Sequence, residues 1–159
     1  MSESLHMRQA ELSDSSAIRE LTRQAYAKWI PVIGREPVPM TTDYVEAVQK
    51  HRIDLVYLDG TLVALIETVP KADHLLIESL AVLPSFQGRG LGRKLMAHAE
   101  RIAASLALGE IRLYANKLFV ENVQLYRRLG YRVDREEDFK GGLLVHMSKQ
   151  IAASGTPSR

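Results

Sequence analysis

The six-residue stretch Gln87–Gly92 holds the strongest chemical signal in the sequence, because three of its residues are glycine. An apolar run, Leu75–Val82, precedes the stretch, and an amphipathic segment, Leu91–Leu106, follows it. Glycine lets a backbone turn tightly and approach a ligand closely, and the first turn of a helix offers free N–H groups and the positive end of its dipole. Arg89 and Arg93 add positive charge at the same place. The order of strand, glycine turn and helix therefore predicts a loop that binds a phosphate group.

The two most common nucleotide-binding fingerprints do not fit this stretch. A dinucleotide-binding loop reads Gly-x-Gly-x-x-Gly; Gly88 and Gly90 satisfy its start, but Arg93 stands at the third glycine position. A P-loop ends in Gly-Lys-Ser/Thr, whereas Gly92 is followed by Arg-Lys. The loop alone therefore leaves two interpretations open, a phosphate site or a turn that only joins a strand to a helix.

The periodicity of the rest of the chain predicts the elements that hold this loop. Apolar residues at helical spacing predict helices, and apolar runs flanked by turn residues predict strands. The predicted elements are a strand at 5–10, a helix from Ser13 or Asp14 through Tyr26, a helix at 44–51, a hairpin at 55–66 around Asp59-Gly60, a strand at 75–82, a helix at 91–106, a strand at 110–115, a helix at 120–129, and strands at 131–134 and 143–148 around an acidic, solvated turn. This order predicts one α/β domain with a mixed sheet over residues 1–150, and a disordered tail at 151–159.

The composition narrows the class of protein. The 159-residue chain has a formal net charge of +2, 46% hydrophobic residues and 25% charged residues, as is usual for a globular domain. A charge of this size does not indicate nucleic-acid binding. Because the chain has no cysteine, disulfides, thiolate metal sites and a cysteine nucleophile are excluded. The histidines show no metal-binding spacing, and no apolar run reaches membrane-spanning length. We therefore expect a cytoplasmic protein that uses no metal, nucleic acid or membrane.

Two segments of the sequence resemble motifs of one enzyme family. Residues 80–92 read Leu-Ala-Val-Leu-Pro-Ser-Phe-Gln-Gly-Arg-Gly-Leu-Gly. Within them, Gln87, Gly90 and Gly92 fill the Gln/Arg-x-x-Gly-x-Gly/Ala signature of the GCN5-related N-acetyltransferases, the GNAT superfamily. The segment Glu121–Tyr131 resembles the family's Asn-x-x-x-Leu-Tyr-x-x-Leu-Gly-Phe/Tyr segment. Both motifs stand in the expected order, and the resemblance covers nearly the whole chain.

This resemblance implies a single-domain GNAT-like fold, in which a mixed, mostly antiparallel central sheet has helices on both faces. It also implies acetyl-CoA (CoA) as co-substrate, with the strand before the loop paired to the pantetheine arm and the loop wrapped around the pyrophosphate. The implied CoA-binding residues are Leu80, Ala81, Val82, Gln87, Gly88, Arg89, Gly90, Leu91, Gly92, Arg93, Asn116, Asn122 and Tyr126. Asn116 and Asn122 have a second interpretation as helix caps.

The implied reaction is attack of a neutral primary amine on the thioester of acetyl-CoA. It needs a base, an oxyanion donor and a proton or hydrogen bond for the leaving thiolate. Tyr126 holds the family's acid position, although a core tyrosine is the alternative. Glu78 is the candidate base because it is a carboxylate in an otherwise apolar strand; a salt bridge within the sheet or an exposed edge is the alternative. Glu67 is the reserve candidate, followed by water, and a backbone N–H near Val82 is the family's usual oxyanion donor.

The acceptor site of similar proteins is built from the first two helices, their loop and the last hairpin. The prolines of segment 29–42 exclude a long helix there, yet the segment is also apolar. The candidate substrate-binding residues are Tyr26, Trp29, Ile33 and Met40, which alternatively only cover the core. The acceptor is a small-molecule amine or a peptide or protein amine, and homodimers are common among similar proteins. The alternative function is a non-catalytic acyl-CoA-binding or regulatory module on the same fold.

Overall fold

The computed structural model describes residues 4–152, and its elements follow the predicted order. The strands are β1 (Leu5–Gln9), β2 (Arg52–Leu58), β3 (Thr61–Pro70), β4 (Leu75–Val82), β5 (Glu110–Asn116), β6 (Arg132–Phe139) and β7 (Gly142–Gln150). The helices are α1 (Ser15–Tyr26), α2 (Ile30–Ile33), α3 (Tyr44–Lys50), α4 (Leu91–Ser105) and α5 (Val120–Arg128). Most of the predicted tail, residues 153–159, lies outside the described residues.

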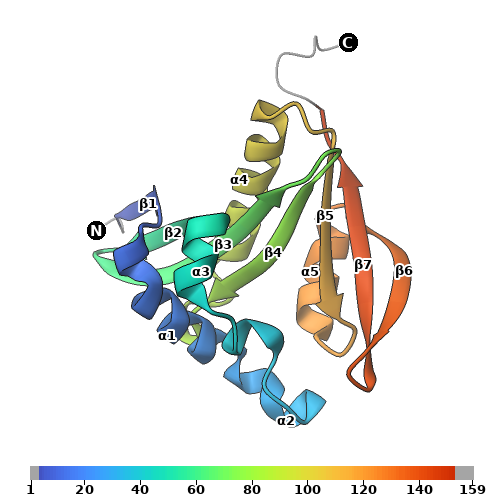
Figure 1. Cartoon of the computed structure of the whole chain (residues 1–159), viewed down its shortest axis with the longest axis horizontal. Coiled ribbons are helices and arrows are strands. Elements are labelled where there is room, and N and C mark those ends of the chain that lie inside the picture. The colour runs from blue at the N-terminus through green and yellow to red at the C-terminus, as the bar shows by residue number, and fades with distance from the viewer. Residues whose placement is uncertain (1–3, 153–159) are drawn as a thin grey trace. The chain divides into compact units, whose positions relative to one another are not determined.

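The strands are ordered β1-β2-β3-β4-β5-β7-β6 (Figure 1). β4 pairs with β5 in parallel, whereas β1 with β2, β2 with β3, β5 with β7 and β6 with β7 are antiparallel pairs. The prediction of an α/β fold with a mixed, mostly antiparallel sheet is therefore confirmed.

The described chain divides into two compact units. The first comprises the chain up to Thr68 together with Ser79–Leu95, and the second comprises Val69–Glu78 and the chain from Met96 onward. The candidate residues are divided in the same way, because the glycine loop belongs to the first unit and Glu78 and Tyr126 belong to the second.

The β2–β3 hairpin is the main sheet element of the first unit. Asp59 and Gly60 form its turn, and both have a left-handed backbone, with φ of 50° and 83°, as a two-residue hairpin turn requires. The register pairs Leu58 with Thr61. α3 packs on β2, and α1 packs on α3 through its apolar face. The hairpin predicted around Asp59-Gly60 is confirmed.

The proline-rich segment after α1 forms only short helical pieces, as its prolines predict. These pieces are the 3₁₀ turn η2 (Ala27–Trp29), α2 and the 3₁₀ turn η3 (Val38–Met40). Gly34, with φ of 77°, ends α2 in a left-handed conformation. Trp29 and Met40 are only 5% and 3% exposed, so the segment fills the core of the first unit with its largest apolar side chains.

The sheet of the second unit has two different faces. In β5, Ile111 and Leu113 are buried, whereas the residues that alternate with them, Arg112 and Tyr114, are exposed. β7 alternates in the same way over its central residues. This period of two is typical of a sheet with one face on a core and a second, polar face. The parallel ladder to β5 involves Leu75–Ile77 of β4.

The acidic run after Tyr131 corrects one prediction. It lies in a strand, β6, and the turn is formed instead by Lys140 and Gly141, which have φ of 48° and 80°. β6 is last in the strand order, and most of its side chains are exposed. The strand predicted at 131–134 therefore continues to Phe139. An edge strand in water needs no apolar alternation, so this charged continuation carries no strand signal.

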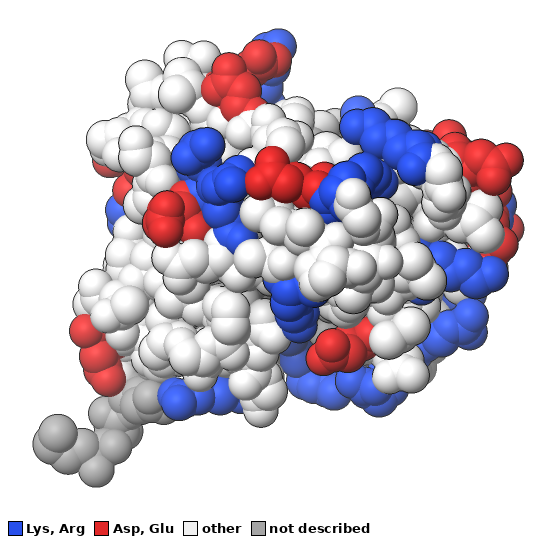
Figure 2. Space-filling view, turned by 90° about the horizontal axis from the view of Figure 1, so that it is seen from below, with Lys and Arg blue, Asp and Glu red and all other residues white. Residues whose placement is uncertain are grey.

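The surface of the chain mixes charges of both signs. Figure 2 shows basic and acidic side chains interspersed over one face, without a large region of a single sign. Within residues 4–152, no helix combines the length and the apolar composition needed to cross a bilayer.

Asp14 ties the start of α1 to β1. Its carboxylate accepts hydrogen bonds from both terminal nitrogens of Arg8, at 2.9 and 2.7 Å, and from the backbone N–H of Glu11 at 2.8 Å. The hydrogen bonds from Arg8 hold the pKa of Asp14 below its usual value.

We predict that Asp14→Asn lowers the free energy of unfolding at neutral pH by about 1–2 kcal/mol, since a charge-assisted pair is lost. Because the folded-state pKa is depressed, this stabilisation is present above the unfolded-state pKa of about 3.9 and is lost as the pH falls through the folded-state value. The difference between wild type and variant, measured by urea unfolding at about pH 7 and about pH 2.5, is therefore expected to shrink at the lower pH. Asp138→Asn, at an exposed position of β6, is the control. A difference that is equal at both pH values contradicts the prediction.

Candidate functional site

The strand that leads into the glycine loop has two regular faces. Odd-numbered residues of β4 are buried and even-numbered residues are half-buried, so Glu78, Leu80 and Val82 share the more open face. Side chains two residues apart share a face because a strand has a period of two. Any chemistry carried by side chains of β4 is therefore restricted to this face.

Two side chains bind the backbone of β4 where it approaches the loop. The hydroxyl of Tyr26 donates to the carbonyl oxygen of Leu80 at 2.9 Å, and the amide of Gln87 donates to the carbonyl oxygen of Val82 at 3.0 Å. Tyr26 is 8% exposed, so its ring is fixed in the core of the first unit. These hydrogen bonds hold the end of β4. They place Tyr26, a predicted substrate-binding residue, and Gln87, a predicted CoA-binding residue, beside the strand end that is predicted to pair with the pantetheine arm.

The glycine loop has the backbone geometry of an anion-binding turn. Gly88 and Gly90 both have φ of 81°, a left-handed conformation that favours glycine. Nothing lies within 4 Å of the position that a side chain would occupy at either glycine, so the loop is open to a ligand. α4 begins at Leu91, and its first hydrogen bond runs from Lys94 N–H to the carbonyl of Gly90 at 3.0 Å. The remaining first-turn N–H groups are the free donors of a helix N-terminus.

Two cationic side chains lie at this loop, one from η2 and one from the loop itself. Lys28, from η2, donates to the side-chain oxygen of Gln87 at 3.0 Å and lies 4.9 Å from the ring of Trp29. The guanidinium of Arg89 lies 4.8 Å from the ring of Phe86, which follows the strand. Sequence reasoning missed Lys28, because no motif places a residue of η2 beside a loop 59 positions later. A positive environment of this kind favours an anionic ligand.

The candidate acid of the second unit is deeply buried. Tyr126 is 7% exposed, and its ring meets that of Tyr131 edge-on at 6.3 Å between centroids. Burial raises the pKa of Tyr126 to about 12. The phenol therefore stays protonated at neutral pH and can act as a hydrogen-bond donor.

The two predicted asparagines differ in their local roles. Asn116 is buried at the end of β5, and its side-chain oxygen accepts from the N–H of Leu118 at 3.0 Å, which shapes the turn into α5. Phe119 stands at the N-cap of α5, and Asn122 lies within its first turn, half-buried. The interpretation of Asn122 as a cap is therefore wrong.

The candidate base has a partner that the sequence did not suggest. The hydroxyl of Tyr114 donates to the carboxylate of Glu78 at 2.8 Å. Tyr114 lies on the polar face of β5, and its ring is 5.9 Å from that of His146 on β7. The pairing of Tyr114 with Glu78 depends on the sheet, because it joins side chains of two neighbouring strands.

The reserve base belongs to a different kind of network. Glu67 is 2% exposed, and its carboxylate lies 2.6 Å from the ring of His51 and accepts from the hydroxyl of Ser79 at 3.1 Å. All three residues belong to the first unit. A buried carboxylate whose two oxygens both have hydrogen-bond partners is typical of a structural role, here the connection of β3 to β4 and to the end of α3.

Most of the predicted acceptor residues are core residues in the first unit. Tyr26, Trp29 and Met40 are buried, and only Ile33, at the end of α2, is half-buried. Their side chains cover the core, which was the alternative interpretation. A substrate contact by these residues stays a prediction.

Comparison with known proteins points to one family. The sequence profile of the acetyltransferase (GNAT) family matches residues 16–131, which is most of the chain. A search of curated proteins gave no match.

Solved structures with this fold come from several acetyltransferases. A PaiA N-acetyltransferase from Thermoplasma acidophilum, in complex with coenzyme A, has 20% identity and a TM-score of 0.79, over 92% of this chain and 99% of that one. The ribosomal-protein-S18-alanine N-acetyltransferase from Escherichia coli has 18% identity and a TM-score of 0.77, over 98% and 99%. A nourseothricin acetyltransferase has 19% identity and a TM-score of 0.72, over 92% and 98%. Likeness at these identities establishes the fold and does not identify an acceptor.

The Glu67–His51 pair leads to a prediction about stability. We expect His51→Ala to lower the free energy of unfolding by roughly 2–3 kcal/mol, because it leaves a buried carboxylate without its partner. Glu67→Gln is expected to remove most of this penalty, so the double variant loses less than the sum of the two single variants. Urea unfolding of the four proteins measures the coupling, and His6→Ala, at an exposed position of β1, is the control. Strictly additive losses contradict a coupled pair.

Proposed function

The chain belongs to the GNAT acetyltransferase family, and we propose that it transfers the acetyl group of acetyl-CoA to the nitrogen of a primary amine. Acetyl-CoA is the co-substrate of this family. The observation that supports the proposal most strongly is the open loop with left-handed Gly88 and Gly90 directly before α4. Such a loop suits the pyrophosphate of CoA, since free N–H groups and the helix dipole meet negative charge there.

We propose that backbone N–H groups of residues 87–93 bind the pyrophosphate. Arg89 and Arg93 are exposed cations in or next to this loop, and Lys28 adds a third from η2. The proposal extends to the pantetheine arm, for which the backbone of Leu80–Val82 is the candidate. The carbonyls bound by Tyr26 and Gln87 remain usable, because a carbonyl oxygen has a second lone pair.

The proposed base is Glu78, acting directly or through water. It stands on the half-buried face of β4 and accepts a hydrogen bond from a hydroxyl, so a carboxylate oxygen can accept a proton. Attack of the amine on the thioester carbon forms the C–N bond, and the proton of that nitrogen passes to Glu78. A backbone N–H near Val82 is the proposed donor to the oxyanion. Glu67 is less suited to this role, because both of its oxygens are already engaged.

The proposed role of Tyr126 is a hydrogen bond to the departing sulfur. When the C–S bond breaks, CoA leaves as a thiolate, which has a reference pKa of about 8.5. Full proton transfer from a phenol with a pKa of about 12 is uphill by roughly 5 kcal/mol. The thiolate therefore takes its proton in the end from solvent or from the protonated base, and Tyr126 lowers the barrier by hydrogen bonding.

The direct test measures release of CoA thiol with acetyl-CoA and a panel of primary amines and peptides. We expect Tyr126→Phe to lower kcat about 10²-fold with little change in binding of CoA, because it removes only a hydroxyl. Glu78→Gln is expected to lower kcat/KM at neutral pH and to recover part of it at alkaline pH, where the amine is already neutral. Unchanged turnover in both variants contradicts the proposed roles of Tyr126 as hydrogen-bond donor and Glu78 as base. Tight binding of CoA without turnover on the whole panel favours the alternative, a non-catalytic acyl-CoA-binding module.

A second prediction tests the loop itself. Gly90→Ala is expected to weaken CoA binding about tenfold or more, since an L residue at φ of 81° strains the turn. Gly34→Ala is the matched control, because Gly34 has φ of 77°, the same open surroundings and no place in the loop. Calorimetric titration with CoA compares the two. Equal weakening by both variants, or by neither, contradicts a specific role of Gly90.

A further inference from the structure

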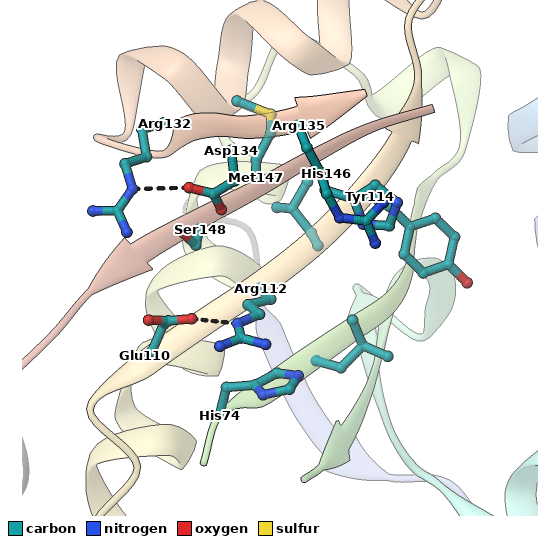
Figure 3. A pocket seen from close by; sticks show the side chains of 12 residues that line it. His74, Glu110, Arg112, Tyr114, Arg132, Asp134, Arg135, His146, Met147 and Ser148 are labelled. Atoms are coloured by element: carbon teal, nitrogen blue, oxygen red, sulfur yellow. Dashed lines mark hydrogen bonds and ion pairs between the residues drawn. The ribbon is translucent and has the colours of Figure 1, made fainter. Parts of the chain in front are cut away.

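A pocket of about 480 Å³ opens on the polar face of the sheet in the second unit. Its lining includes His74 at the start of β4, Arg112 and Tyr114 of β5, Arg135 of β6 and His146 of β7 (Figure 3). This volume lies in the range of small-molecule sites. The proposed function assigns no role to the pocket.

Two of the arginines in the pocket are neutralised by carboxylates beside them. Arg112 forms an ion pair with Glu110 and lies 3.7 Å from Asp73, and Arg132 donates to Asp134 at 2.9 Å. The hydrogen bond from Arg112 lowers the pKa of Glu110. These carboxylates therefore stay ionised and offer little attraction to a further cation.

Arg135 is the cation of this pocket with the weakest partner. Within the described residues, its only ion pair is with Glu137, at a distance of 4.0 Å. The same carboxylate lies much closer, at 2.7 Å, to the ring of His146. The side chain of Arg135 is 61% exposed, and Figure 3 shows it directed from β6 toward Tyr114. A guanidinium in this state binds a carboxylate well, because its planar fork matches two oxygens.

Tyr114 lies between the strand positions of this cation and the proposed base. The ring of Tyr114 is 5.9 Å from that of His146 on the pocket side, and its hydroxyl donates to Glu78 at 2.8 Å on the other side. The register places Arg135 opposite His146 and His146 opposite Tyr114, so these three residues are neighbours across β6, β7 and β5. A ligand that is held by Arg135 and reaches Glu78 therefore has to extend past Tyr114, which requires a chain of several single bonds of about 1.5 Å each.

We infer that the pocket selects the acceptor, and that the acceptor is a small amine whose carboxylate, held by Arg135, lies several bonds from the nitrogen. An α-amino acid is too short, because its amine and carboxylate share one carbon. A simple alkylamine has the nitrogen but lacks the anchor. This inference rests on the proposed function, since it places the amine at Glu78.

The test uses two matched series with acetyl-CoA. One series contains glycine, β-alanine, 4-aminobutyrate, 5-aminopentanoate and 6-aminohexanoate, and the other contains n-alkylamines of the same lengths without the carboxylate. We expect kcat/KM for the longer amino acids to exceed that for the matching alkylamines at least tenfold, and glycine to be poor. Arg135→Gln is expected to abolish the preference and to leave the KM for acetyl-CoA unchanged. Arg128→Gln, at an exposed position of α5, is the control and keeps the preference.

Binding separates failure of the inference from failure of the proposed function. Turnover of both series with equal efficiency, unaffected by Arg135→Gln, overturns the inference and leaves acetyl transfer intact. If neither series turns over, ligand-observed NMR with 6-aminohexanoate and hexylamine decides. If 6-aminohexanoate binds, hexylamine does not, and Arg135→Gln abolishes the binding, the result supports the pocket as a site for an amino acid and contradicts the proposed acetyl transfer. Equal binding of both ligands, or binding of neither, overturns the inference.

Discussion

The period-two alternation of β4 is the constraint on which the candidate site depends. Leu75 and Ile77 are buried, so Glu78 and Leu80 must lie on the half-buried face. A shift of the strand by one residue would exchange its faces. It would bury the Glu78 carboxylate among apolar groups and remove it from Tyr114, at a cost of several kcal/mol for an unpaired buried charge. The chemistry of this strand is therefore set by the packing of its other face.

The backbone beside the glycine loop is held by side chains from distant parts of the first unit. Tyr26 reaches the carbonyl of Leu80 from α1, and Lys28 reaches Gln87 from η2. Gln87 in turn binds the carbonyl of Val82, so strand, loop and η2 form one hydrogen-bonded chain. Such support lowers the entropy that a loop loses when it orders around a ligand. The apolar segment after α1 thus supports the loop as well as covering the core.

The candidate base Glu78 and the reserve candidate Glu67 have different environments. Glu67 is almost fully buried and bonded to His51 and Ser79, whereas Glu78 is half-buried and bonded to a single hydroxyl. A carboxylate whose two oxygens both accept hydrogen bonds is held in place, whereas one with a single hydrogen bond keeps an oxygen that a substrate can reach. The residue type therefore made both glutamates candidate bases. We prefer Glu78 because its carboxylate has fewer hydrogen-bond partners and is less buried.

The sequence by itself determined the features that depend on local periodicity and turn chemistry. The β2–β3 hairpin follows from Asp59-Gly60, the face shared by Glu78 and Leu80 follows from the period of two of any strand, and the left-handed loop follows from its glycines. These properties are local, because backbone sterics and side-chain direction act over a few residues. The start of β6 was predicted, but its charged continuation over 135–139 was predicted as a turn, because an edge strand in water needs no apolar pattern.

Only the tertiary structure decided the pairings between distant residues. Tyr114 with Glu78, His51 with Glu67 and Lys28 with Gln87 join side chains 36, 16 and 59 positions apart. No periodicity encodes such pairs, because they depend on strand register and on the path of the loops. The strongest signal of the sequence, the glycine loop, thus specifies what kind of ligand the chain holds, while the contacts around Glu78 and Arg135 arise from the packing of the sheet.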